Sequence, residues 1–368
     1  MKRPLLTLLL ITLLVITKAQ IPAGYYDPAT GKTGALLKTA LFDIIKGHTE
    51  VTYTPGVWNA FYTTDKKSNG KVWDMYSDIP GGTPPYEFTF GTPDQCGSGG
   101  SNLESDCYNR EHSWPRSWFG GEVPPMNTDL FHIVPTDKFV NAQRSNYAFG
   151  EVGVASWTSL NGSKLGISKS QGYSGIVFEP RDEYKGDFAR NYFYMATRYE
   201  NIISTWHSND VNAEAILQPN SYPVFETWFI NLLLKWNAAD PVSDKETNRN
   251  NAVYAIQHNR NPFIDHPEYV NSVWGTNVGI TKSPAQEILQ IYPNPVSEMC
   301  TITLPADFNQ QNTAFTVYSS TGIPVFAPVT VSGDKAVLNL ENSPSGIYLV
   351  RIATDNYSTI YQARIIKK

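Results

Sequence analysis

Two patterns of apolar and polar residues divide the chain. Over its first three quarters, apolar residues recur every three or four positions, which is the spacing of one face of an α-helix. Leu37, Leu41 and Ile44 show this spacing, and elsewhere aromatic and leucine side chains follow it. We expect these apolar stripes to be buried. The predicted helices span residues 35–46, 190–199, 224–237 and 244–258.

Beyond residue 281 the pattern changes to short β-branched runs separated by turn residues, and Trp no longer occurs. Such runs are typical of strands. About 85 residues with this pattern predict a small all-β sandwich. The predicted strands span residues 301–304, 315–318, 336–340, 347–352 and 359–363.

The first residues have the form of a secretory signal peptide. Lys2 and Arg3 precede an apolar run of 12 residues, Leu5–Ile16. Small residues then favour cleavage after Ala19. A membrane anchor is the alternative, but roughly 20 apolar residues are needed to cross a bilayer. We therefore expect residues 1–19 to be removed, no later segment to span a membrane, and the mature protein to be soluble and exported.

Charge is distributed unevenly along the 368 residues. The whole chain has a net charge of −5, but residues 1–19 carry three basic residues and residues 281–368 carry six basic and six acidic ones. Residues 20–280 therefore hold 20 basic and 28 acidic residues, a net charge of −8. This balance argues against a protein that coats nucleic acid through bulk positive charge. An anionic substrate must instead be held locally, by a metal ion and a few Arg or Lys side chains.

The C-terminal region resembles the type A sorting domain of the type IX secretion system. The resemblance rests on IYPNPVSE (Ile291–Glu298), on the turn into a strand at Gly346–Tyr348, and on the terminal Lys367 and Lys368. It implies that residues 281–368 engage the secretion machinery after passage through the periplasm. The protein is then expected to cross the outer membrane and to be released or attached to the cell surface. A carbohydrate-binding or adhesive sandwich is the alternative.

The candidate chemistry lies in a polar, loop-rich insert, residues 91–150, where Glu, His, Asp, Asn and Arg are dense. His112 is a candidate general base, because imidazole accepts a proton near neutral pH. Glu111 offers an oxygen ligand suited to Mg²⁺ or Ca²⁺. Adjacent side chains on a regular strand point to opposite faces, so both can serve one site only at a strand end, bend or bulge. A Glu–His pair on the surface, with no function, is the alternative.

A short helix is expected after Pro135, with Thr136 as its cap and Asp137 near the positive end of its dipole. Asn141 would lie in the first turns of this helix. Its amide carbonyl is a neutral oxygen ligand, consistent with a magnesium site that keeps several waters.

The insert and its flanks resemble the endonuclease I family of secreted and periplasmic nucleases. The resemblance covers roughly residues 30–275, and its blocks occur in the family's order. They are REHSWPRSWFG (Arg110–Gly120), DLFHIVPTDKFVNAQRSNYAFGEV (Asp129–Val152), ARNYFYM (Ala189–Met195) and HNRNPFID (His258–Asp265). The resemblance implies an α+β fold, in which a ββα-metal core is embedded in a mainly helical domain at residues 20–280.

The resemblance also implies roles for single residues. His112 matches the family's general base, and Glu111 and Asn141 match its ligands for one Mg²⁺ ion, for which Ca²⁺ or Mn²⁺ could substitute. The family's DLHNLVP pattern reads DLFHIVP here, with Phe131 and His132 at the altered positions. This departure concerns the support of the metal site.

A second departure concerns the substrate phosphate. Well-known family members carry an Arg for the cleaved phosphate on a long insertion, which is shortened here to residues 121–126 and contains no Arg. Arg116 and Arg144 are the candidates to replace it, and either could instead be a solvated or structural residue.

The implied reaction is in-line attack of water on phosphorus, leaving 5′-phosphate and 3′-hydroxyl ends. No base-reading helix or dimer motif is recognisable. We therefore expect a monomer that cleaves DNA without sequence specificity, and RNA is a second candidate substrate. Two rival hypotheses remain. One is a zinc hydrolase with His112, Asp129 and His132 as ligands, and the other is a non-catalytic secreted protein that binds nucleic acid or glycan.

Two of the three cysteines are expected to pair. Cys96 and Cys107 lie 11 residues apart in an exported chain, and we expect them to form a disulfide that staples the loop before Arg110. Two free thiols are the alternative. Cys300 lies in the C-terminal region and is expected to be a buried strand residue.

Overall fold

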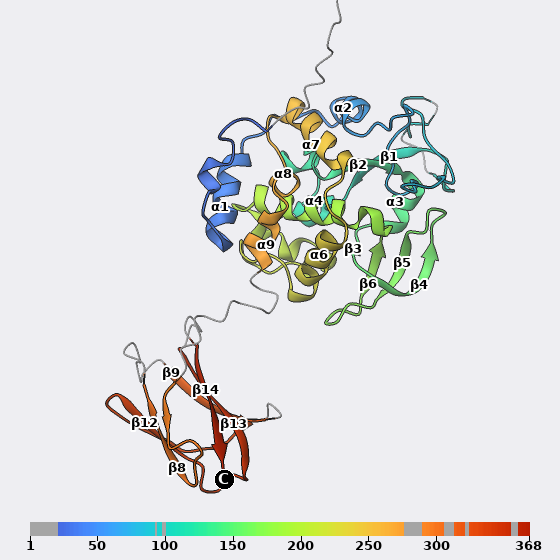
Figure 1. Cartoon of the computed structure of the whole chain (residues 1–368). Helices are drawn as coiled ribbons and strands as arrows, with labels where there is room; N and C mark the ends of the chain where they lie inside the picture. The colour runs from blue at the N-terminus through green and yellow to red at the C-terminus, as the bar shows by residue number, and fades with distance from the viewer. Residues whose placement is uncertain are drawn as a thin grey trace, which may run out of the picture. The chain divides into compact units, whose positions relative to one another are not determined.

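The computed structural model describes residues 21–92, 94–97, 101–275, 289–304, 313–320, 324–354 and 360–368. The chain divides into two compact units, Met1–Thr276 and Asn277–Lys368, which are described separately (Figure 1). The predicted signal peptide, residues 1–19, and the predicted boundary at residues 280–281 lie outside the described residues. Within the described residues, none of the helices has the length and apolar character needed to cross a membrane.

Helices build most of the first unit. Helix α4 lies at its centre and is buried along its whole length, with α1, α6 and α8 packed against it (Figure 1). The four helices predicted from apolar spacing are all present, with ends shifted by a few residues. The helices are α1 (Gly34–Ile45), α2 (Gly56–Thr64), α3 (Lys138–Arg144), α4 (Lys185–Arg198), α5 (Val211–Glu214), α6 (Thr227–Ala239), α7 (Asp244–Gln257), α8 (Pro262–Asp265) and α9 (Glu268–Trp274).

Two sheets complete this unit, which is therefore α+β, as expected. One consists of β1 (Tyr108–His112) and β2 (Ile133–Asp137), paired antiparallel so that Arg110 lies opposite Pro135. The other has four strands in the order β3-β6-β5-β4, with β3 and β6 parallel. These strands are β3 (Ala148–Phe149), β4 (Val152–Thr158), β5 (Lys164–Ser168) and β6 (Ile176–Glu179).

Strand β2 leads directly into α3. The predicted cap of this helix was one residue off: Asp137, not Thr136, is the N-cap, and its side chain accepts a hydrogen bond from the Val140 amide at 3.0 Å. Thr136 is still part of β2 and is fully buried. Asn141 is therefore the fourth residue of α3, in its first turn.

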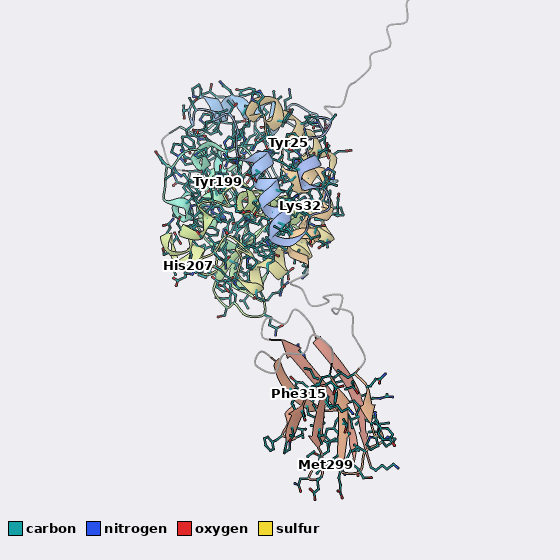
Figure 2. All side chains as sticks on the ribbon, turned by 90° about the vertical axis from the view of Figure 1, so that its left-hand side faces the viewer. Tyr25, Lys32, Tyr199, His207, Met299 and Phe315 are labelled. Atoms are coloured by element: carbon teal, nitrogen blue, oxygen red, sulfur yellow. A yellow bond between two sulfur atoms is a disulfide. The ribbon has the colours of Figure 1, made fainter. Side chains whose placement is uncertain are left out.

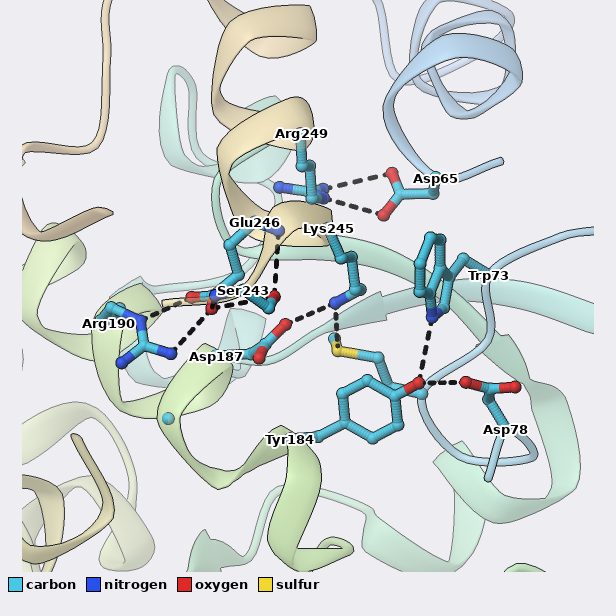
Figure 3. Close-up of polar contacts among 12 residues, drawn as sticks. Asp65, Trp73, Asp78, Tyr184, Asp187, Arg190, Ser243, Lys245, Glu246 and Arg249 are labelled. Carbon is cyan, nitrogen blue, oxygen red and sulfur yellow. Dashed lines mark hydrogen bonds and ion pairs between the residues drawn. The ribbon is translucent and has the colours of Figure 1, made fainter. Parts of the chain in front are cut away.

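Polar contacts fasten α7 to distant parts of the unit (Figure 3). At its start, Ser243 and Glu246 cap each other's backbone, and Glu246 also receives two hydrogen bonds from Arg190 of α4. One turn further on, Arg249 pairs with Asp65 at 2.8 Å and donates to the carbonyl oxygens of Leu130 and Ile133. Helix α7 thus holds the segment that enters β2.

The second unit is a β-sandwich of two four-stranded antiparallel sheets, ordered β10-β9-β13-β14 and β11-β12-β8-β7. Apolar side chains, with Cys300 among them, are buried between the sheets. Asn294 of the sequence motif fastens the last strand, because its amide donates to Arg364 O and accepts from Ile366 N. The strands are β7 (Ile291–Tyr292), β8 (Met299–Thr303), β9 (Thr313–Ser319), β10 (Pro324–Val325), β11 (Val329–Ser332), β12 (Lys335–Asn339), β13 (Gly346–Thr354) and β14 (Ile360–Lys367).

Candidate active site

A pocket of about 430 Å³ lies where β1, α3 and the loops around Tyr53 and Pro115 meet. The structure brings to this pocket every residue that the nuclease hypothesis assigned to catalysis or metal binding. They are Glu111, His112, Arg116, Asn141 and Arg144.

His112 is the last residue of β1, which satisfies the condition that a Glu–His pair can share one site only at an irregular place in a strand. Its Nε2 atom lies 3.2 Å from the carbonyl oxygen of Asn127. Because a carbonyl oxygen only accepts, Nε2 must carry the proton, which leaves the lone pair on Nδ1. Burial, reinforced by nearby His132, lowers the pKa of His112 well below its usual value. The imidazole is therefore neutral at neutral pH.

Glu111 is buried beside His112, with 2% of its side chain exposed. Its Oε1 atom accepts hydrogen bonds from the Tyr76 hydroxyl at 3.0 Å and from Arg144 at 2.8 Å. Burial raises the pKa of Glu111 to about 7, and Arg144 and Tyr76 oppose this rise. Since both hydrogen bonds go to Oε1, Oε2 is the oxygen left for a further ligand.

The two candidate arginines lie in different environments. Arg144 is 1% exposed and donates to Glu111 and to the carbonyl oxygens of His112 (2.9 Å) and Ser113 (2.6 Å). Its guanidinium is engaged by groups of the protein itself. Arg116 lies at the rim, with 39% of its side chain exposed, and pairs with Glu122, which is itself 74% exposed.

Asn141 faces the pocket from α3. Its Nδ2 atom donates to Arg110 O at 3.4 Å, so its carbonyl Oδ1 remains as an acceptor. Glu111 Oε2 and Asn141 Oδ1 are both hard oxygens on one pocket, a donor pair that fits Mg²⁺ or Ca²⁺. Ionisation of Glu111 in this buried position would also be favoured by a cation. Residues Glu111 and Asn141 therefore fit a hard divalent ion that keeps several of its waters.

The residues of the zinc hypothesis do not converge. Asp129 accepts hydrogen bonds from Tyr194 and Tyr199, and His132 Nε2 contacts Met126 O at 2.7 Å. Among the described residues, no three His, Cys, Asp or Glu side chains lie together so that they could hold a metal ion. His132, at one of the positions that depart from the family pattern, instead packs with its ring 5.4 Å from that of His112.

Several residues at the pocket were not singled out from the sequence. Tyr76 bonds Glu111 from 35 residues away, and Tyr53 lines the pocket from the loop before α2. Asn127 contributes only its backbone carbonyl, for which a side-chain pattern gives no signal. Arg110 lies inside the motif that begins REH, and its position next to Glu111 was the sequence signal that could have placed it at the pocket.

The disulfide between Cys96 and Cys107 is present, as predicted, with a Cα–Cα distance of 5.2 Å. It lies directly before β1. The backbone of Cys107 accepts from the Lys138 amide, and that of Cys96 donates to Tyr108 O. The disulfide therefore anchors the loop at Cys96 to the start of β1, and the hydrogen bond from Lys138 to Cys107 links that point to the start of α3.

Comparisons with known proteins identify the family of each unit. Residues 33–268 match the model of the endonuclease I family, and residues 290–368 match that of a secretion system C-terminal sorting domain. An extracellular ribonuclease of Bacillus amyloliquefaciens is 38% identical over 71% of this chain and 81% of its own. An extracellular ribonuclease of Bacillus subtilis (strain 168) is 36% identical over 68% and 78%. Endonuclease-1 of Buchnera aphidicola subsp. Baizongia pistaciae is 27% identical over 38% and 46%.

The fold, the pocket and these matches define a secreted nuclease. The chain belongs to the endonuclease I family, and it carries a C-terminal sorting domain of a secretion system. Both resemblances noted in the sequence are confirmed.

Proposed function

We propose that this protein is a metal-dependent endonuclease that hydrolyses phosphodiester bonds of nucleic acids without sequence specificity. The observation that carries the proposal is that Glu111, His112 and Asn141 meet at one pocket. The His112 ring is neutral there, and its Nε2–H donates a hydrogen bond to Asn127 O.

The proton transfer belongs to His112. A water molecule between the ring and the phosphate would give its proton to Nδ1 as its oxygen attacks phosphorus. The carbonyl of Asn127 keeps the ring in the required tautomer and would favour the imidazolium that forms. General-base catalysis of this kind is worth about 10²–10⁴ in rate. Attack in line with the 3′ oxygen leaves 5′-phosphate and 3′-hydroxyl ends.

Glu111 and Asn141 would hold the metal ion, with Mg²⁺ the first candidate and Ca²⁺ or Mn²⁺ the alternatives. When bound, such an ion stabilises negative charge on the phosphate and on the leaving oxygen. Arg144 holds the Glu111 carboxylate in place through a buried ion pair. Arg116 is the better candidate for the cleaved phosphate, because its guanidinium lies at the rim and its carboxylate partner Glu122 is largely exposed.

DNA and RNA are both proposed as substrates. The two relatives matched over about four fifths of their own length carry the name ribonuclease, whereas the family and the shorter match carry the name endonuclease. The pocket presents His, Asn and Arg groups suited to a phosphate backbone, which the two polymers share. We further propose that the sorting domain directs the enzyme through the type IX machinery across the outer membrane, and that the enzyme acts as a monomer.

Incubation of the purified protein with plasmid DNA and with RNA, in Mg²⁺ or in EDTA, tests the proposal. We expect cleavage of at least one polymer in Mg²⁺ and none in EDTA, with 5′-phosphate ends on the products. Binding without cleavage under every divalent metal would instead identify the non-catalytic binding protein.

A further inference from the structure

Arg110 forms part of the pocket wall, and neutral groups hold it there. Its guanidinium carbon lies 3.5 Å from the centre of the Tyr53 ring and 4.4 Å from that of Trp58. Its Nη1 atom donates to Tyr53 O at 2.6 Å and to Thr54 Oγ1 at 2.9 Å. Two aromatic rings and two uncharged oxygens thus fix the cation in one position.

The positive charge of Arg110 is offset only in part, because the exposed carboxylate of Glu122 attracts it without forming an ion pair with it. Arg144, Arg190 and Arg249 each pair with a buried carboxylate, whereas among the described residues Arg110 forms no ion pair with one. Arg116 adds a second cation, 5.9 Å from the same Tyr53 ring. Arg110 is thus a partly buried cation beside another of like sign, and the exposed carboxylate of Glu122 is shared between the two. A further anion in the pocket would therefore be electrostatically favourable.

We propose that Arg110, backed by Tyr53, forms a subsite for the phosphate of a nucleotide next to the bond that is cleaved. This inference rests on the proposed nuclease function. Glu111 and Arg110 are consecutive in β1, so their side chains diverge and reach different parts of the pocket. The phosphate bound by Arg110 is therefore a neighbour of the one at Glu111 and Asn141, and its binding requires no metal ion.

Equilibrium binding of a short fluorescent oligonucleotide in EDTA tests the subsite apart from catalysis. The variants are Arg110→Met and, as a matched control, Lys32→Met. Lys32 is exposed just before α1, on the side of the unit away from β1 and α3 (Figures 1 and 2). For Arg110→Met we expect about a tenfold loss of affinity. The slope of log affinity against log salt should fall by about one. Lys32→Met should match the wild type in both.

Cleavage kinetics give a second reading. In Mg²⁺, Arg110→Met should raise KM about tenfold while kcat changes little, because the subsite binds substrate and transition state alike. An Arg110→Met protein with wild-type affinity and salt dependence would overturn the inference, as would a loss confined to kcat. A wild-type protein that binds through Arg110 yet cleaves nothing would refute the proposed function and leave the subsite standing.

Arg110 lies in β1, so circular dichroism must show that the variant is folded. If it is not, Tyr53→Leu is the second test, because it removes the aromatic backing and leaves the strand unchanged. We expect it to weaken oligonucleotide binding several-fold in EDTA with the salt slope retained. Unchanged affinity in Tyr53→Leu would then contradict the proposal.

Discussion

The guanidinium of Arg144 lies 2.8 Å from the Glu111 carboxylate, and neither side chain is more than 2% exposed. The two residues come from α3 and β1, and their contact fixes a carboxylate at the floor of the candidate active site. Because the same guanidinium also binds the carbonyl oxygens of His112 and Ser113, it holds the end of β1 as well. Arg144 is thus built into the support of the pocket.

Replacement of Arg144 should destabilise the fold. In Arg144→Met the Glu111 carboxylate is buried without its cation, and we expect the free energy of unfolding to fall by about 3–5 kcal/mol. Adding Glu111→Gln should restore part of the loss, since no buried charge is then left unpaired. Denaturant unfolding of the wild type, the single variant and the double variant measures these changes. Arg116→Met is the matched control, and its exposed pair with Glu122 predicts a change of less than about 1 kcal/mol. Equal losses in the two single variants would refute the contrast.

Replacement of His112 should abolish catalysis and leave the fold intact. For His112→Ala we expect kcat to fall by about 10²–10⁴, the usual contribution of a general base. The proposed binding of Mg²⁺ at Glu111 and Asn141, measured by calorimetry, should persist. His207→Ala, outside the pocket, should keep wild-type rates. Near-normal cleavage by His112→Ala would show that another group takes the proton.

Loss of the disulfide should lower the free energy of unfolding by about 3 kcal/mol, because it closes the loop between Cys96 and Cys107, which lie 11 positions apart. The double variant with Ser at both positions tests this by thermal unfolding. Reductant should shift the wild type towards the variant and leave the variant unchanged. If reductant shifted both proteins equally, the effect would come from elsewhere.

Because Lys38 is buried, we expect the free energy of unfolding to rise at alkaline pH. Burial lowers the pKa of Lys38 from 10.5 to about 8, against the opposing attraction of Glu200, which lies 2.9 Å away. Between these two pH values the unfolded chain binds more protons than the folded one. The contribution of Lys38 to the free energy of unfolding of the protein therefore increases as the pH rises from about 8 to 10.5. Unfolding curves of Lys38→Met should lack this contribution, whereas Lys32→Met should follow the wild type.

Patterns within short stretches of sequence were sufficient for much of the fold. Helix α1 and the main strands of the sandwich came within a few residues of their predicted bounds, because periodicity and turn residues act between near neighbours. The cap of α3 was misplaced by one residue. Asp137 and Thr136 are both competent caps, and the end of the pairing between β1 and β2 selects between them.

The motif around residues 110–144 indicated which residues would form the candidate site, and all of them line one pocket. The motif could not show which of the two arginines is buried beside Glu111 and which lies at the rim. Arg116 and Arg144 have the same chemistry, and only the packing of α3 against Glu111 and Phe149 places one beneath the pocket and the other at its rim.

Local sequence was enough to indicate two regions of different structure, the type of most elements and the disulfide. It also indicated the residues that we propose for proton transfer and metal binding. Each of these is encoded in composition, spacing or a contiguous motif. Only the packing of distant segments fixes the hydrogen bond of His112 Nε2 with Asn127 O, the pairing of Tyr76 with Glu111, and the absence of an ion pair at Arg110 among the described residues. These properties depend on groups brought together from distant parts of the chain, and no local pattern records such contacts.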